Sequence, residues 1–404
     1  MFNNFQSSPT RLPIINKSVT KGIMNKLPIN PFKFGGLVEG EYYLPRPNLE
    51  NFVSQFLINR IHVVLIGPRR FGKTSFLLNL LKKLNNSSHS YIFIDIFNIT
   101  SHKDFLHQML RALKNREGWL DSFKSTLKSF ASLRPKMSTQ IDPNTGSSSF
   151  DFTLDSVTSS EKDIKEVIQD VLSSLSKLET GSIFAIDEFQ KVTEIDDGGW
   201  LEATLRTHMQ QLRNISFIFT GSRRSVIYDM LNNPSRPLYK FCQSIEFPSF
   251  GDEFTDWILK RFMNVGITCD RDAIEHLRKL VQDTPNYVQM VCFHLVALGK
   301  NEITIEEVNS ALKIVVQQNA YAYQTLLSTL TPTQQRTLRL AAKEGKQIFG
   351  KELLKKYEIS SGAALSSAIK SLKDKEILDE EGAGRGTVIF DDPLFAIWLK
   401  TSFE

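Results

Sequence analysis

The 404-residue chain has few cysteines and no long apolar segment. Its three cysteines, Cys242, Cys269 and Cys292, form no C-x-x-C pair and have no histidine-rich segment beside them, so neither a disulfide framework nor a zinc site is expected. No apolar run approaches the ~20 residues of a membrane-spanning helix, and the N-terminus lacks the apolar core of a secretory signal. We therefore expect a cytoplasmic protein with no membrane partner.

The chain also has no strong excess of charge. Its formal net charge is +5, from 49 Lys and Arg against 44 Asp and Glu, which permits contact with nucleic acid without requiring it. Part of the excess lies in residues 1–38, which hold five basic residues and no acidic one among many Asn, Ser and Pro. This segment is predicted to be a flexible basic arm that orders against a partner, or equally a disordered tail without a role.

A phosphate-binding loop lies between an apolar strand and a helix. Residues 67–74 read G-P-R-R-F-G-K-T and follow the apolar run 61–66. Glycines let backbone N–H groups surround a phosphate, and the helix N-terminus adds its positive end. Lys73 is expected to reach the β and γ phosphates, and the Thr74 hydroxyl to hold Mg²⁺. The expected nucleotide contacts of this loop are Gly67, Pro68, Arg69, Arg70, Phe71, Gly72, Lys73, Thr74 and Ser75.

A second apolar run, 182–186, ends in two carboxylates, Asp187 and Glu188. Open α/β sheets bind ligands at the carboxyl ends of their strands. Asp187 is therefore expected in the Mg²⁺ shell, and Glu188 is expected to orient and deprotonate the attacking water. The alternative is an ordinary strand that ends in a solvated acidic turn, and the phosphate loop makes it less favoured.

A third apolar strand, at 216–220, is followed by a serine and two arginines. Ser222 is predicted to hydrogen-bond the γ-phosphate or the attacking water. Arg223, Arg224 and Arg236 are candidates for stabilising charge on the transferred phosphoryl group, within the chain or on a neighbouring subunit. The alternative for each arginine is a surface charge without a direct role.

The remaining pattern predicts how these motifs are organised. Strand candidates at 61–66, 91–96, 182–186, 216–220 and 243–247 alternate with helical stretches. This alternation predicts a parallel, helix-covered sheet, which we place in an ATPase core over 39–247. Within it, residues 134–160 carry turn residues between alternating apolar positions, which predicts a β-hairpin insertion or else a mobile loop.

Helical spacing follows the predicted core, and residues 248–325 are expected to form a lid that closes over the nucleotide. Pro285 begins an apolar helix and is expected against the adenine. It also suits the first position of a helix, and the two roles are compatible. Upstream of the phosphate loop, Leu44, Pro45 and Arg46 are expected to pack over the base.

The last section, 326–404, has the pattern of a winged helix. Two helices precede a third with helix-turn-helix spacing, and two short strands around a glycine-rich wing follow over 378–390. Residues 331–404 hold twelve basic and eleven acidic residues. This near-neutral charge is unusual for a DNA reader, because phosphate neutralisation dominates affinity. Both DNA contact and a packing role remain open for this domain.

Taken together, these motifs resemble the archaeal-type ATPase family, a branch of the AAA+/STAND P-loop ATPases. The resemblance runs from about residue 42 to the C-terminus. Six stretches carry it: G-P-R-R-F-G-K-T-S at 67–75, I-D-E-F-Q at 186–190, F-T-G-S at 219–222, R-P-L-Y at 236–239, T-P-N-Y at 284–287 and D-D-P-L-F-A-I-W-L at 391–399.

The resemblance implies ATP and Mg²⁺ as ligands and the roles given above for Lys73, Thr74, Asp187 and Glu188. The absence of the guanine motif N-K-x-D agrees with ATP. The family often has G-R after L-Y, whereas Lys-Phe follows here, so Arg236 or Arg224 would serve as the arginine finger. Where the family often has G-G-x-P before the lid helix, this chain has Asp-Thr-Pro, which weakens a sensor-2 assignment.

The expected fold class is α/β: a P-loop parallel sheet of the AAA+ (ASCE) type with a helical lid and a C-terminal winged helix. The expected function is an ATPase that acts as a homo-oligomeric switch or motor in a DNA transaction, through its arm and winged helix. The main alternative is a signalling or defence ATPase with a protein partner, in which the winged helix is structural. A slow nucleotide-binding module and a kinase are weaker alternatives.

Overall fold

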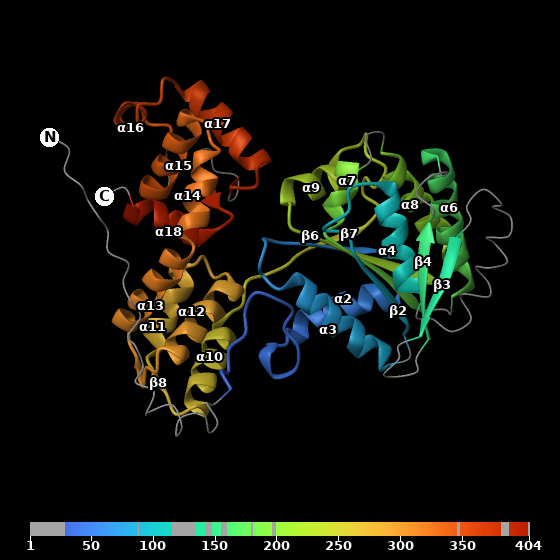
Figure 1. The fold of residues 1–404 in the computed structure, drawn as a ribbon, viewed down its shortest axis with the longest axis horizontal. Helices are drawn as coiled ribbons and strands as arrows, with labels where there is room; N and C mark the ends of the chain where they lie inside the picture. Colours follow the sequence, from blue (N-terminus) through green and yellow to red (C-terminus); the bar gives the residue numbers. More distant parts are fainter. Residues whose placement is uncertain are drawn as a thin grey trace.

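The computed structural model describes residues 29–87, 89–114, 135–141, 148–154, 160–178, 181–195, 199–345, 348–380 and 388–402, with only the backbone of the two strands at 135–141 and 148–154. Figure 1 shows a lobe built on a β-sheet beside a lobe made almost entirely of helices. Residues 1–28, most of the predicted arm, lie outside the described part. Within that part, no helix combines the length and apolarity needed to cross a bilayer.

Five parallel strands form the sheet of the first lobe, in the order β2-β5-β6-β1-β7. Their bounds are β1 (Val63–Ile66), β2 (Tyr91–Asp95), β5 (Ser182–Asp187), β6 (Ile215–Gly221) and β7 (Gln243–Glu246). The three central strands are buried at every position, because helices cover both faces of a parallel sheet. The predicted fold class is confirmed, and each strand lies where the apolar runs place it.

Two hydrophobic clusters pack on opposite faces of this sheet. One face carries α2 (Pro47–Ile58) and α3 (Lys73–Asn85). The other carries α4 (His102–Lys114), α6 (Glu161–Ser174), α8 (Trp200–Gln211) and α9 (Arg224–Asn232). Alternate residues of β1, β2, β5 and β6 enter the two clusters, as the pleat requires. The motif-bearing strand ends therefore emerge at one edge of a rigid, doubly covered sheet.

The interval that breaks the strand-helix alternation contains an antiparallel pair. β3 (Pro135–Ile141) and β4 (Ser148–Leu154) pair residue for residue along their full lengths. The pairing is that of the predicted β-hairpin, whose turn lies outside the described residues.

The second lobe joins the lid to the winged helix. The lid contains α10 (Asp252–Asn264), α11 (Arg271–Leu280), α12 (Pro285–Ala297), α13 (Ile305–Gln318) and a parallel pair, β8 (Thr268–Cys269) with β9 (Glu302–Ile303). The winged helix contains α14 (Ala320–Ser328), α15 (Pro332–Glu344), α16 (Lys351–Lys356), α17 (Gly362–Asp374), the antiparallel strands β10 (Leu378–Glu380) and β11 (Val388–Phe390), and α18 (Pro393–Ser402).

The lid and the winged helix share one hydrophobic core. A single cluster of buried side chains extends from α10 to α18, and α18 packs on both α13 and α14. The hydrophobic core of the described residues therefore continues across the predicted boundary between the lid, 248–325, and the winged helix, 326–404.

Residues 29–38, which the predicted arm includes, instead form a connector between the lid and the core. Phe32 is 1% exposed and packs on Phe262, with 4.7 Å between ring centroids. The Val38 N–H donates to Ser75 Oγ of α3 at 3.1 Å, and Asn30 donates to the Phe293 carbonyl at 2.9 Å. Burial of an aromatic ring therefore orders this part of the basic segment.

One buried histidine makes the stability of the fold depend on pH. His62 Nδ1 accepts a hydrogen bond from the Phe217 N–H, and burial lowers the pKa of this ring below its usual value. The unfolded chain therefore binds a proton below about pH 6.5 that the folded chain resists, and stability falls as the pH drops through that value. We expect His62→Asn, whose amide oxygen can still accept the Phe217 N–H, to reduce the loss of melting temperature between pH 7.0 and 5.5 by about 2 °C. An equal loss in both proteins would contradict this assignment.

Candidate functional site

The phosphate loop is shaped by two glycines at positions that other residues resist. Gly72 caps α3 with φ +89°, in the left-handed region. Gly67 lies against the end of β7, where a Cβ would stand 2.8 Å from the Cβ of Phe247. The loop can therefore pass close to the sheet edge and lead into α3, where backbone N–H groups at the helix N-terminus can bind a phosphate.

The Lys73 side chain lies inside this loop. It is 5% exposed, and its Nζ donates to the Gly67 and Pro68 carbonyls at 2.8 Å each. Burial lowers the pKa of Lys73 to about 8, against the opposing effect of Glu188, Asp187 and Asp391. An anion at the loop would satisfy this ammonium better than two neutral carbonyls do.

Two hydroxyls meet the Asp187 carboxylate at the end of β5. Thr74 Oγ1 donates to Oδ2 at 2.5 Å, and Thr220 Oγ1 donates to Oδ1. Burial raises the pKa of Asp187, and the two hydroxyl donors oppose that shift. A carboxylate beside a hydroxyl is a hard oxygen donor set of the kind that Mg²⁺ prefers, so Thr74 and Asp187 fit the ion.

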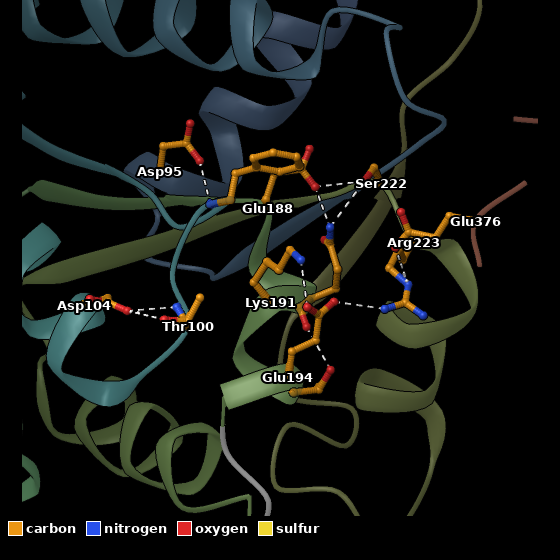
Figure 2. Close-up of polar contacts among 12 residues, drawn as sticks. Asp95, Thr100, Asp104, Glu188, Lys191, Glu194, Ser222, Arg223 and Glu376 are labelled. Carbon is orange, nitrogen blue, oxygen red and sulfur yellow. Dashed lines mark hydrogen bonds and ion pairs between the residues drawn. The ribbon is translucent and has the colours of Figure 1, made fainter. Parts of the chain in front are cut away.

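Glu188 follows in a left-handed conformation, with φ 57° and ψ 43°. Its Oε2 accepts a hydrogen bond from Ser222 Oγ at 2.8 Å, and Figure 2 shows these two side chains facing each other. The same oxygen accepts from Gln190 Nε2 at 2.5 Å. Non-glycine residues rarely adopt this backbone conformation, and here it directs the predicted base toward the third strand.

A cavity of about 610 Å³ lies between the core and the lid. The predicted residues Arg70, Phe71, Gly72, Lys73, Thr74, Ser75, Glu188, Leu44, Arg46 and Pro285 all line it. Its volume suits a small-molecule ligand. Pro285 is also the first residue of α12, as expected of a proline at a helix start, and its place against the adenine stays a prediction. Pro45 lies between two lining residues, and Gly67, Pro68 and Arg69 complete the loop beneath.

The connector also lines this cavity, a role that the sequence pattern did not suggest. Lys33, Gly35 and Val38 lie along it, as does Asp95 at the end of β2. Asp95 pairs in register with Asp187 on the neighbouring strand. The apolar run before Asp95 could have indicated a further acidic strand end, whereas no periodicity marks the connector.

Arg46 has a structural role at the hinge between core and lid. Its guanidinium carbon lies 3.5 Å from the ring centroid of Phe250 and 4.5 Å from that of Phe247. The guanidinium also donates a hydrogen bond to the Pro248 carbonyl at 2.7 Å. Burial lowers the pKa of Arg46 to about 10. Arg46 therefore anchors the 247–250 segment through cation–π contacts, and its contact with the base stays a prediction.

Four arginines around the phosphate loop pair with acidic residues of the winged helix. Glu376 binds both Arg69 and Arg223, the latter at 2.9 Å (Figure 2). Arg224 binds Asp379 at 2.8 Å. In the fourth pair, the Arg70 guanidinium approaches Asp392 to 3.4 Å. Carboxylates thus occupy Arg223 and Arg224, which were expected to serve a phosphoryl group, and two arginines that were expected to contact the nucleotide from the phosphate loop.

The remaining predicted arginine, Arg236, lies apart from this group. It binds the buried Glu202 at 2.6 Å and lies 3.7 Å from Asp229. It lines neither the large cavity nor the smaller one that Arg69, Arg223 and Arg224 border. Its role as an arginine finger, like that of Arg224, stays a prediction.

Comparison with known proteins agrees with this geometry. A sequence profile described as AAA domain matches residues 59–227, and one described as probable winged helix domain matches residues 321–401. A search of curated proteins gives no significant match.

Two solved structures share the fold. The Walker-type ATPase PABY2304 of Pyrococcus abyssi is 19% identical with a TM-score of 0.62, over 91% of this chain and 99% of that one. The ORC2 protein of Aeropyrum pernix, solved with ADPNP and ADP, is 14% identical with a TM-score of 0.50, over 87% and 90% of the two chains. The chain therefore joins an AAA domain to a C-terminal winged helix domain and shares the fold of these two structures.

Proposed function

We propose that this protein binds ATP with Mg²⁺ between core and lid and hydrolyses it. The observation that carries the proposal is the convergence of Lys73, Thr74, Asp187 and Glu188 at one sheet edge beside the cavity. Lys73 would bind the β and γ phosphates, and Thr74 and Asp187 would hold the ion. Bound Mg²⁺ supplies charge neutralisation of the phosphates. Glu188 would orient the attacking water and accept its proton.

We further propose that hydrolysis drives a homo-oligomeric switch or motor that acts on DNA. The basic segment at the N-terminus and the helix-turn-helix of α16 and α17 support a duplex target. A neighbouring subunit could use Arg224 or Arg236 as an arginine finger once the present ion pairs are broken.

A protein partner is the second candidate. The winged helix has a near-neutral charge, twelve basic against eleven acidic residues over 331–404, and its acidic edge is engaged by the core. Both features favour a structural module that a protein trigger releases.

One experiment tests the proposal and separates these candidates. The full-length protein would be measured for mass in solution and for ATP turnover, with and without duplex DNA at several salt concentrations. Higher-order assembly with DNA-stimulated, salt-sensitive turnover supports the DNA switch. A monomer with slow turnover that DNA does not change supports the protein-triggered switch, and no turnover under any condition contradicts hydrolysis.

The ion pairs of the winged helix lead to a prediction about ATP affinity. Glu376 pairs with Arg69 and shares Arg223 with Glu194. Glu376→Gln should therefore free Arg69 for phosphate, weaken the hold on Arg223 and remove a negative charge from the site. Exposed ion pairs contribute roughly 0.2–1 kcal/mol each, so ATP should bind about three- to tenfold more tightly to the variant. A fluorescent ATP analogue would measure the dissociation constant.

The matched control for this measurement is Glu358→Gln, which breaks a surface pair with Arg336 in the same domain. The control should leave ATP affinity unchanged. Unchanged or weaker binding by Glu376→Gln would show that these arginines do not serve the phosphates.

A further inference from the structure

The predicted base is held by an amide that sequence analysis gave no role. Gln190 follows Glu188 by two residues, in a short 3-10 turn over Phe189–Lys191. Its Nε2 lies 2.5 Å from Glu188 Oε2 and 3.2 Å from Ser222 Oγ. With the Ser222 hydroxyl, it gives this one carboxylate oxygen two donors. Among the described residues, none donates to the other oxygen, Oε1.

The orientation of the amide follows from this geometry. A flipped Gln190 would place its carbonyl oxygen against the carboxylate, acceptor against acceptor, so Nε2 must face Glu188. The Gln190 side chain is 0% exposed, and its own oxygen has no hydrogen-bond partner within the described residues. Burying a carbonyl oxygen without a hydrogen-bond partner lowers the stability of the fold. The hydrogen bond from Nε2 to the predicted base gives a reason for this orientation of the amide.

The surrounding residues fix the amide in place. Phe189 stacks on Phe219 of β6 with 4.1 Å between ring centroids, which anchors the 3-10 turn to the third strand. Gly221 makes room for Ile227 and for the amide, because a Cβ there would stand 2.7 Å from Ile227 Cγ1 and 3.0 Å from the Gln190 oxygen. The turn, the strand and the missing Cβ together set the amide between Glu188 and Ser222.

We propose that Gln190 is a positioning residue for hydrolysis, which holds Oε2 of Glu188 so that Oε1 remains to accept the proton of water. This inference rests on the proposed ATP hydrolysis and adds to it the group that aims the base. Gln190 does not line the cavity, so it acts through Glu188 and not on the nucleotide.

A double-mutant cycle tests this role in the full-length protein with ATP and Mg²⁺. Gln190→Met keeps the length of the side chain and removes the donor. Misplacing a catalytic group by about 1 Å costs on the order of 100-fold in rate, so we expect the single-turnover rate to fall roughly 10- to 100-fold. The dissociation constant of a fluorescent ATP analogue should change less than about twofold, because the cavity lining is intact. In the Glu188→Gln background, the same change should alter the rate less than about twofold.

Each outcome decides between distinct claims. Equal slowing in both backgrounds, or no slowing in either, overturns the positioning role while Glu188 remains the base. If Glu188→Gln itself leaves the rate unchanged, the proposed base fails, and this inference fails with it. Gln211→Met, an exposed glutamine on α8, is the matched control and should match the parent protein. Should melting curves show that Gln190→Met unfolds, Gln190→Leu removes the same donor and should slow turnover only when Glu188 is present.

Discussion

Lys73→Met is expected to weaken ATP binding by at least about 100-fold. Methionine keeps the apolar stem inside the phosphate loop but cannot form charge-assisted hydrogen bonds to the β and γ phosphates. Each such bond contributes roughly 1.5–3 kcal/mol, and a factor of 100 in affinity corresponds to about 2.7 kcal/mol. Titration with a fluorescent ATP analogue would measure the loss.

The empty protein should tolerate this substitution well. Burial has already lowered the pKa of Lys73 to about 8, so its charge is held at a cost when no phosphate is present. The melting temperature of the variant should therefore equal or exceed that of the parent, which separates lost binding from misfolding. Lys82→Met, on the exposed side of the same helix and paired with Glu39 at 2.7 Å, should bind ATP normally. Binding by Lys73→Met within threefold of the parent would remove the lysine from the phosphate site.

Glu188→Gln is expected to lower the single-turnover rate of ATP hydrolysis by roughly 100- to 1000-fold, the range for a general base. The amide retains the shape of the side chain and can still accept hydrogen bonds from Ser222 and Gln190, but it cannot take the proton of water. ATP affinity should stay equal or rise, because a negative charge near the γ-phosphate is removed. Rapid-quench measurement with excess protein isolates the chemical step from product release.

The matched control for this prediction is Glu166→Gln, an exposed glutamate of α6 that lies 3.9 Å from Lys162. It should hydrolyse ATP at the parent rate. A turnover rate of Glu188→Gln within threefold of the parent would exclude this residue as the base and support a slow nucleotide-binding module.

Local sequence patterns were enough to predict the sheet and which residues lie at its edge. The apolar runs before Gly67, Asp187 and Gly221 define buried strands, and parallel strands carry their final residues to one edge. The phosphate loop needs only residues close in the chain, so its glycines and Lys73 could be recognised directly. The helix spacing and the small wing of the C-terminal domain were equally local signals.

Contacts between distant segments could not be predicted in this way. Arg70 and Asp392 are 322 residues apart, and an acidic residue in a loop carries no signal of the arginine that it will meet. Phe32 lies among Asn, Pro and Lys, in a basic segment without hydrophobic periodicity. Its burial in the lid core could therefore not be predicted from the sequence. Gln190 is visible within the motif I-D-E-F-Q, but only the fold around Gly221 reveals what its amide binds.

The lid and the winged helix share one hydrophobic core, so we expect these two domains to move as one rigid unit. A rotation that closed α12 over ATP would carry α17 with it, because separating the two helices would expose apolar side chains to water. By thermodynamic reciprocity, a partner that prefers the winged helix in its ATP-bound position must raise ATP affinity by the same factor. A partner that binds the winged helix should therefore be detected as a change in the dissociation constant of ATP.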